Sequence, residues 1–163
     1  MTSIERVDED QWERLRALRI AAFEHDAEVF GSSLEREAGL KEMHWRMRAR
    51  ASAWFVAVQA GADVGLVCAI QEPGAAEDDR HVVGLWVRPQ SRGGGVGDAL
   101  VAAVGDWARS DGAMTVSLWV TEDNAPAQAL YRRNGFEPTG ESMPLPRDPS
   151  RVEHRWHRVL NAS

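Results

Sequence analysis

The feature that most constrains this chain is a cluster of glycines within 93–97, directly ahead of a run with helical periodicity. A glycine costs roughly 1 kcal/mol relative to alanine inside a helix, so the cluster favours a loop. The preceding run, His81–Val87, predicts a strand that stops at Arg88-Pro89. The glycines therefore lie between the carboxyl end of a strand and the amino end of a helix. Free N–H groups and the helix dipole favour an anion there, such as a pyrophosphate, and Arg92 can add a charge-assisted contact.

The helix behind the glycines is predicted by apolar side chains at helical spacing. These are Val96, Leu100, Val101, Val104 and Trp107.

Two common phosphate motifs do not fit the loop. A Walker loop needs Gly-Lys-Ser or Gly-Lys-Thr, but residues 96–98 read Val-Gly-Asp. The dinucleotide fingerprint needs a third glycine, and the registers that start at Gly93 and Gly95 have Asp98 and Leu100 there. A nucleotide-binding module is therefore disfavoured, and a glycine turn without a ligand is the remaining alternative.

Composition limits the class of protein. A chain of 163 residues with 44% hydrophobic and 27% charged residues predicts one soluble domain over 1–163. The net charge of −6 argues against nucleic acid as a partner. The single cysteine, Cys68, lies in an apolar run, which excludes a disulfide framework and predicts a buried small side chain. We find no signal peptide and no apolar run long enough for a membrane, so we expect a cytoplasmic protein.

The histidines give no indication of a metal. Apart from His81, they are His25, His44, His154 and His157, and none has metal-ligand spacing with carboxylates or the cysteine.

Periodicity and turn residues predict the order strand, two helices, three strands, helix, strand, helix, two strands. The strands are Ile4–Val7, Trp54–Gln59, Val64–Ile70, His81–Val87, Thr115–Val120, Phe136–Gly140 and Val152–Val159. The first helix is capped by Asp8 or Asp10 and runs through Trp12 to Ala22. The other helices cover Leu34–Arg50, the run after the glycines to about Arg109, and Ala125–Arg133. Pro144, Pro146 and Pro149 predict an extended loop. The fold class is mixed α/β with an antiparallel N-terminal half, and His81–Val87 should pair in parallel with Thr115–Val120.

Two segments resemble motifs of the GNAT N-acetyltransferase superfamily. The stretch 87–100 resembles its acyl-CoA loop, where Arg92, Gly95 and Gly97 match the pattern Arg or Gln, two residues, Gly, one residue, Gly or Ala. The stretch 124–136, about 25 residues further on, is similar to the second motif, with Asn, Ala, Leu-Tyr and Gly-Phe in order. Residues 27–33 also resemble a stretch of many small bacterial members. The resemblance covers nearly the whole chain in element order.

This resemblance implies a GNAT fold with a central mixed sheet of six to seven strands, about four helices, and parallel strands that splay at the acyl-CoA site. It implies acetyl-CoA as co-substrate, no metal, and a small-molecule or peptide amine as acceptor; a homodimer stays open. The pantetheine arm would pair with Leu85 to Val87, and the Val87 N–H would polarise the thioester carbonyl for direct attack by the amine. The implied cofactor-binding residues are Leu85, Trp86, Val87, Arg92, Gly93, Gly94, Gly95, Val96, Gly97, Asp98, Asn124, Ala127 and Tyr131.

The resemblance makes Tyr131, the single tyrosine, the general acid for the departing thiolate. A phenol stays protonated at neutral pH, but a core aromatic residue is the alternative. Asn124 is expected to cap its helix and to bond the pantetheine arm.

The general base is less determined. Ribosomal-protein N-terminal acetyltransferases carry a glutamate five residues before this asparagine, and Trp119 stands there instead. His81 and Glu122 remain as candidates. We expect His81 at the far end of its strand from the loop, as a surface histidine, and Glu122 as a solvated loop acid; a chain of waters is a third option.

Aromatic side chains are the candidates for the acceptor site. Phe30, Trp86 and Trp119 are expected to line it, and core packing is the alternative for each tryptophan. The leading hypothesis is an acetyl-CoA-dependent N-acetyltransferase acting on a primary amine. The alternative is a catalytically idle acyl-CoA-binding sensor on the same fold.

Overall fold

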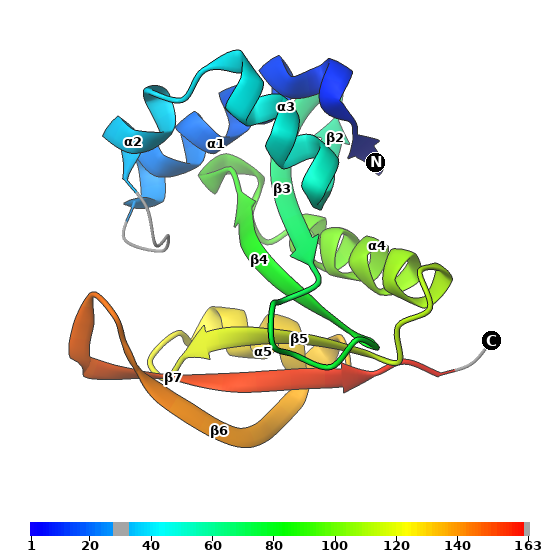
Figure 1. Ribbon diagram of the computed structural model, residues 1–163, viewed down its shortest axis with the longest axis vertical. Coiled ribbons are helices and arrows are strands. Elements are labelled where there is room, and N and C mark those ends of the chain that lie inside the picture. Colours follow the sequence, from blue (N-terminus) through cyan, green and yellow to red (C-terminus); the bar gives the residue numbers. More distant parts are fainter. Residues whose placement is uncertain (28–32, 162–163) are drawn as a thin grey trace. The chain divides into compact units, whose positions relative to one another are not determined.

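The strands of this protein form a sheet that contains both antiparallel and parallel pairs. The structure, a computed structural model, describes residues 1–27 and 33–161. Within them, seven strands neighbour one another in the order β1-β2-β3-β4-β5-β7-β6. The strands are β1 (Thr2–Val7), β2 (Ala53–Gln59), β3 (Ala62–Ile70), β4 (Asp79–Val87), β5 (Thr115–Thr121), β6 (Glu137–Leu145) and β7 (Asp148–Val159). The helices are α1 (Trp12–Asp26), α2 (Leu34–Ala38), α3 (Glu42–Ala51), α4 (Val96–Ser110) and α5 (Ala125–Arg133) (Figure 1).

This arrangement confirms the predicted mixed α/β class. The pairs β1–β2, β2–β3, β5–β7 and β6–β7 are antiparallel, and β4 and β5 pair in parallel. The parallel ladder joins only Asp79–His81 of β4 to Thr115–Ser117 of β5. The later residues of β4 are not part of this ladder, as expected for strands that splay.

The chain packs as two units, each built from separate segments. The first unit comprises Met1–Ala69 and Gly84–Leu100, and the second comprises Ile70–Val83 and Val101–Ser163. The single domain over 1–163 stays a prediction.

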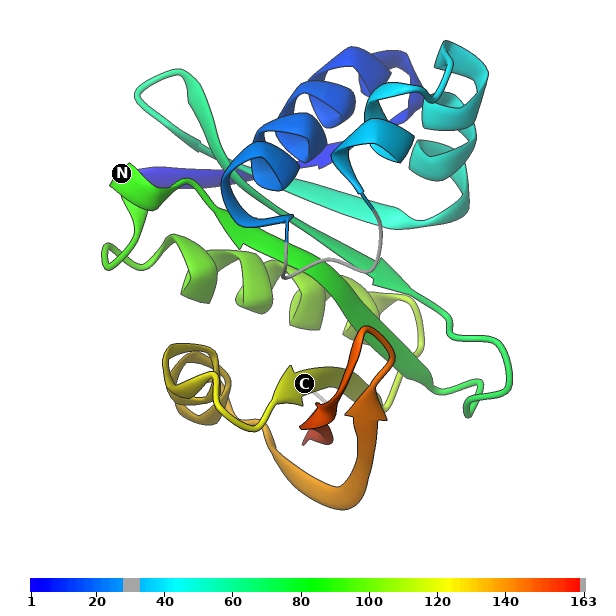
Figure 2. The same ribbon diagram turned by 90° about the vertical axis from the view of Figure 1, so that its left-hand side faces the viewer.

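In the first unit, β1, β2 and β3 pair in antiparallel order, and α1 and α3 lie on one face of these strands (Figure 2). The face of α1 toward the core carries Leu15, Leu18, Ala22 and Phe23, all buried. Cys68 on β3 lies opposite Trp54 of β2 and is buried as predicted. Burial raises the pKa of its thiol to about 12.

The predicted helix Leu34–Arg50 is wrong, because it is two helices, α2 and α3. The Gly39 N–H donates to carbonyls of α2, and Lys41 has extended backbone, so the chain leaves the helix between them. Within this range the sequence also predicts an irregular apolar side made of Leu40, Met43, Trp45 and Met47. That prediction is wrong, because Met43 and Met47 are exposed and only Trp45 of the four is buried. The four residues are spaced by two and three positions, which a helix distributes around its surface, and the other buried position of α3 is Ala49, four residues after Trp45.

A buried carboxylate joins the three helices of this unit. Glu37 on α2 has no exposed side-chain surface. Its Oε1 accepts from Arg19 on α1 and from Arg48 on α3, each at 2.8 Å, and its Oε2 accepts from Arg48 at 3.0 Å. Burial alone would raise the pKa of Glu37, but hydrogen bonds from Arg48 and the charge of Arg19 outweigh it and lower the pKa.

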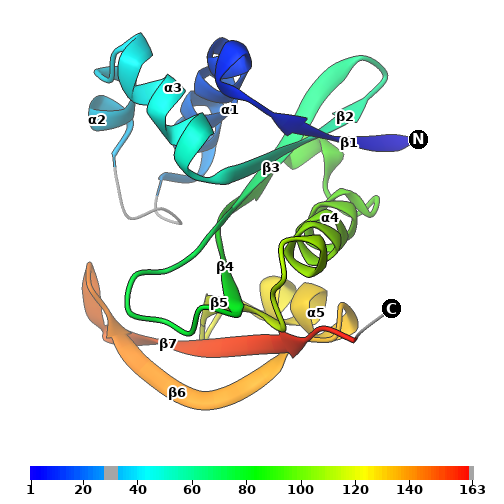
Figure 3. The same ribbon diagram turned by 45° about the vertical axis from the view of Figure 1, so that its right-hand side comes forward.

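In the second unit, β5, β7 and β6 lie alongside one another, and β6 and β7 form a long hairpin (Figure 3). The extended loop predicted from Pro144, Pro146 and Pro149 is wrong, because β6 reaches Leu145 and β7 begins at Asp148. Pro144 fits in β6 because β6 is the last strand in the order and almost entirely exposed, so it has no further ladder to supply.

We expect Glu37→Gln to lower the free energy of unfolding by about 3 kcal/mol at pH 7, because two arginines lose a buried charged partner. Since the pKa of Glu37 is lower in the folded state, its contribution is complete above the unfolded pKa and is lost as the pH falls through the folded pKa. Urea unfolding at neutral and acidic pH measures both effects. The control is Glu35→Gln, an exposed position on the same helix, which should change stability by less than about 0.5 kcal/mol. Equal effects of the two substitutions would contradict the role of Glu37.

Candidate functional site

The glycine loop between β4 and α4 is open and depends on left-handed backbone. Gly93 has φ +82° and Gly95 has φ +88°, conformations that a residue with a Cβ rarely adopts. A Cβ built at Gly93, Gly94 or Gly95 has no neighbouring atom within 4 Å. The loop is therefore free of side chains that would fill it.

The N–H groups at the start of α4 are available to a ligand. The first helical bond here is donated by Ala99 to the carbonyl of Gly95 at 3.0 Å. In the described part of the chain, the N–H groups of Gly95, Val96 and Gly97 have no hydrogen-bond acceptor. Val96 and Leu100 anchor the helix through buried side chains. This is the geometry of an anion site at a helix N-terminus.

The end of β4 offers a second set of backbone groups. The Arg88 N–H donates to the carbonyl of Val64 on β3 at 2.8 Å. Because successive residues of a strand point their N–H groups to opposite edges, Val87 and Leu85 direct theirs away from β3. Gly84, with φ +65°, interrupts the regular strand just before them. The Val87 N–H therefore points to the edge of β4 opposite β3, and its role as oxyanion donor stays a prediction.

Arg92 is held by the protein itself. Its Nε donates to the Val87 carbonyl at 2.9 Å, and its Nη2 donates to Asp26 Oδ2 at 2.7 Å. The indole N–H of Trp86 donates to the same oxygen at 2.7 Å. Sequence reasoning missed Asp26, and no local signal marks it, because its partners lie 60 and 66 residues away.

The predicted acceptor tryptophans belong to different units of the chain. Trp86 is only 4% exposed and belongs to the first unit, where it stacks on His25. Trp119, in the second unit, is half-buried, with the Arg155 guanidinium 5.6 Å from its ring centroid. Phe30 lies outside the described residues. The acceptor site built from these side chains stays a prediction.

Asn124 and Tyr131 are positioned by α5, whose bounds agree with the prediction. The Asn124 side chain accepts from the Ala127 N–H at 3.2 Å, so its capping role is confirmed. Gly135, with φ +91°, follows the other end of the helix. Tyr131 is buried, packs edge-on against Phe136 with centroids 5.8 Å apart, and has its pKa raised by burial to about 12. Within the part of the chain that the structure describes, its hydroxyl has no hydrogen-bond partner.

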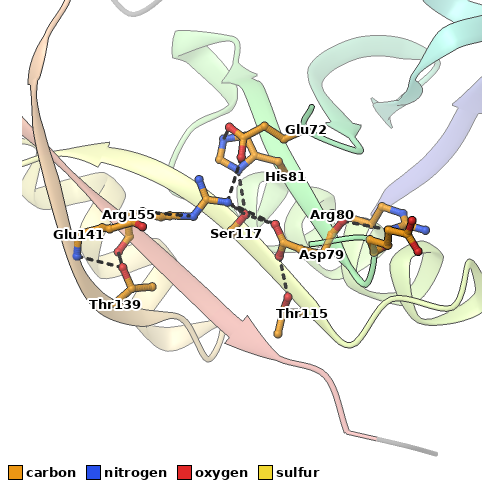
Figure 4. A network of polar contacts seen from close by, with 10 residues as sticks. Glu72, Asp79, Arg80, His81, Thr115, Ser117, Thr139, Glu141 and Arg155 are labelled. Atoms are coloured by element: carbon orange, nitrogen blue, oxygen red, sulfur yellow. Dashed lines mark hydrogen bonds and ion pairs between the residues drawn. The ribbon is translucent and has the colours of Figure 1, made fainter. Parts of the chain in front are cut away.

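His81 is buried in the second unit, so the prediction of a surface histidine is wrong. Its side chain is 4% exposed, and its Nδ1 lies 2.8 Å from the Ser117 hydroxyl. Ser117 in turn donates to Asp79 Oδ2 at 2.6 Å and accepts from Arg155 at 2.9 Å (Figure 4). Strand alternation says nothing of what surrounds a side chain, and here β5, β7 and the 71–78 loop contribute the groups around His81.

The hydrogen bonds of this network indicate the tautomer of His81 in its neutral form. Because the Ser117 proton goes to the carboxylate of Asp79, a neutral His81 must carry its proton on Nδ1. Its Nε2 then faces Glu72, with 3.7 Å between Nε2 and Oε2. Burial lowers the pKa of His81, and the Glu72 carboxylate offsets only part of that effect.

Asp79 ties the parallel strands together. Its Oδ1 accepts from the Thr115 hydroxyl at 2.7 Å, and its Oδ2 accepts from Ser117. A signal for this network does exist in the sequence. Asp79 and His81 alternate on one strand, and Thr115 and Ser117, which stand opposite them, alternate on the other.

An open cavity of about 420 Å³ lies beside this network in the second unit. Its lining includes Glu72, Ala76, Asp79, Ser117, Glu141 and Arg155. The other base candidate, Glu122, has a side chain that is 64% exposed and lies outside this lining, as expected for a solvated loop acid.

Two further findings concern the described residues. Across 1–27 and 33–161, no group of three or more His, Cys, Asp or Glu side chains is arranged to hold a metal ion. No helix among these residues is both long enough and apolar enough to cross a membrane.

Comparisons with known proteins agree on one family. The model of the acetyltransferase (GNAT) family matches residues 12–136. Mycothiol acetyltransferase from Brachybacterium faecium is 36% identical over 75 residues, which are 46% of this chain and 23% of that protein. This chain thus matches less than a quarter of the length of that relative.

Solved structures share the fold. The acetyltransferase of the GNAT family from Streptococcus pneumoniae has a TM-score of 0.81 at 16% identity, with 99% of this chain and all of that chain covered. A Salmonella typhimurium protein solved with its cofactor acetyl-CoA has a TM-score of 0.76 at 16% identity, with 100% of this chain and 96% of that chain covered. These likenesses confirm the predicted fold.

The burial of His81 predicts its titration. We expect its imidazole to titrate below the usual value of 6.5, because burial disfavours the charged ring. NMR titration of the histidine ring signals measures this pKa, and His81→Gln assigns the signal by removing it. A signal for His81 that titrates at or above 6.5 would contradict the buried, neutral ring.

Proposed function

This chain belongs to the acetyltransferase (GNAT) family, and we propose that it transfers the acetyl group of acetyl-CoA to a primary amine of a small molecule or a peptide. The name of the mycothiol acetyltransferase and the acetyl-CoA of the Salmonella protein support this reaction. The observation that carries the proposal is the set of free N–H groups at Gly95, Val96 and Gly97.

These groups fit the diphosphate of CoA. A diphosphate is a bulky anion, and the loop gives it open space at three consecutive glycines, 93–95. The dipole of α4 and the Arg92 guanidinium add positive potential at the same place. The first turn of α4 already carries the acidic residue Asp98. The helix dipole that stabilises this carboxylate also favours an anionic ligand at the same end of the helix.

The free edge of β4 fits the acyl end of the same molecule. Leu85 and Val87 direct backbone groups away from β3, where an extended pantetheine arm would pair with them as a strand does. We assign the Val87 N–H to the thioester carbonyl oxygen, on which negative charge develops during attack. When bound, acetyl-CoA supplies an activated carbonyl, so the amine nitrogen bonds to its carbon while the carbon–sulfur bond breaks.

Tyr131 is proposed to give its proton to the departing thiolate. Its pKa of about 12 keeps the phenol protonated at neutral pH, and its hydroxyl has no competing hydrogen bond within the described residues. Asn124, whose side chain caps α5, is proposed to bond the pantetheine arm as well.

The base that takes the proton of the amine is outside this proposal. His81 is six residues before Val87 on β4, and the two residues belong to different units. Glu122 is mostly exposed and lies outside the lining of the described cavity. Both stay predictions.

The direct experiment has two readings. Calorimetry measures CoA binding, and an assay of thiol release with acetyl-CoA surveys a panel of amines that includes polyamines and peptides. We expect CoA to bind and at least one amine to release thiol. Binding of CoA without thiol release by any amine would support the idle acyl-CoA-binding alternative. Displacement of a bound ligand by ATP but not by CoA would support a nucleotide-binding module.

We expect Gly95→Val to abolish CoA binding, because a side chain at φ +88° distorts the loop and occupies the space of the diphosphate. Calorimetric titration with CoA measures the loss. The matched control is Gly112→Val, which introduces the same side chain at φ +85° in an equally open turn after α4. Both variants should lose about 1–2 kcal/mol of stability from the backbone alone. Unchanged CoA affinity in the Gly95 variant would remove the loop from the cofactor site.

Tyr131→Phe should lower turnover about 10²-fold, within the range for the loss of a general acid. The fold should be unaffected, because the ring still packs on Phe136 and the lost hydroxyl has no hydrogen-bond partner in the described structure. Steady-state thiol release gives turnover, and CoA affinity and melting temperature serve as controls. Wild-type turnover in this variant would show that another group protonates the thiolate.

A further inference from the structure

Asp26 is an acidic residue at a position that its own helix does not favour. It is the last residue of α1, where the negative end of the helix dipole disfavours a carboxylate. The helix therefore gives no reason for an acid here. The side chains around it do, because it accepts two hydrogen bonds from other elements.

One of these hydrogen bonds comes from β4 and the other from the proposed cofactor loop. Trp86 Nε1 on β4 and Arg92 Nη2 in the loop each lie 2.7 Å from Asp26 Oδ2. Trp86 is buried on β4 and stacks on His25 of α1, so the indole N–H that binds the Asp26 carboxylate is itself held in place. Burial alone would raise the pKa of Asp26, but the hydrogen bonds from Trp86 and Arg92 lower it, so the carboxylate is charged at neutral pH.

Arg92 is held in place and still has hydrogen-bond donors that a ligand can use. Of the five N–H donors of a guanidinium, one on Nε binds the Val87 carbonyl and one on Nη2 binds Asp26. In the described structure, the other three donate to no protein acceptor. With its side chain 48% exposed, Arg92 can bind an anion without leaving Asp26.

We propose that Asp26 is a positioning residue for the cofactor, which holds Arg92 in the orientation that binds the diphosphate of CoA. This inference rests on the proposed function. A long arginine side chain loses rotamer freedom when it binds a ligand, and the two hydrogen bonds impose that loss before CoA arrives. Asp26 also carries a negative charge close to the anion, so its net effect on affinity is the outcome of two opposed contributions. We expect the gain in CoA affinity from the oriented Arg92 to exceed the loss from the charge of Asp26.

A double-mutant cycle separates these contributions. CoA affinity is measured by calorimetry for the unmodified protein, Asp26→Ala, Arg92→Ala and the double variant. We expect Asp26→Ala to raise the Kd for CoA about 3- to 10-fold when Arg92 is present. In the Arg92→Ala background, the same substitution should change Kd less than about twofold. Asp26→Asn, which keeps an acceptor oxygen, should restore part of the affinity.

The control is Glu42→Ala, which breaks an exposed pair with Arg46 on α3 and should leave Kd unchanged. An equal rise of Kd in both backgrounds would show that Asp26 supports only the fold, and a fall in Kd would show that it competes with the ligand. Either result overturns the inference while the proposed function stands. Failure of the unmodified protein to bind CoA overturns the proposed function itself.

Discussion

The N–H groups at the start of α4 are the constraint on which the proposed chemistry depends. They are free because Gly93 and Gly95 take left-handed backbone, which turns the chain so that no carbonyl or side chain reaches them. Buried residues of α4 hold the helix, and the edge of β4 ends beside the loop. A substitution that closed this turn would leave the first unit folded and remove the feature that recognises an anion.

Charged groups inside the protein are used in the same way in both units. Glu37 in the first unit and Asp79 in the second are buried carboxylates that accept from two or more side chains on other elements. Each one joins short segments to their neighbours, the five-residue helix α2 in one case and the parallel ladder of Asp79–His81 with Thr115–Ser117 in the other. Burying a carboxylate is costly unless its partners are in place, so each network also specifies which elements must meet.

Sequence reasoning succeeded where the controlling residues are local. The ends of α5 follow from Asn124, Pro126 and Gly135, which act within a few positions of the helix, and the glycine loop follows from φ angles that glycine alone adopts easily. It failed at the break between α2 and α3, where weak signals at Gly39 and Lys41 compete with good helix formers on both sides.

The site residues that were missed depend on distant partners. His81 was expected at the surface because alternation assigns a face of a strand and says nothing of what covers it. The role of Asp26 is set by Trp86 and Arg92, more than 50 positions away in the chain, and no spacing rule connects them.

The buried thiol of Cys68 has a practical consequence. Its raised pKa and its place between neighbouring strands keep it from the thiolate form that reacts with disulfide dyes and alkylating agents. Since this is the single cysteine of the chain, the folded protein contributes almost no background colour when such a dye is added. The native sequence is therefore already suited to attaching one fluorescent probe at an introduced surface cysteine.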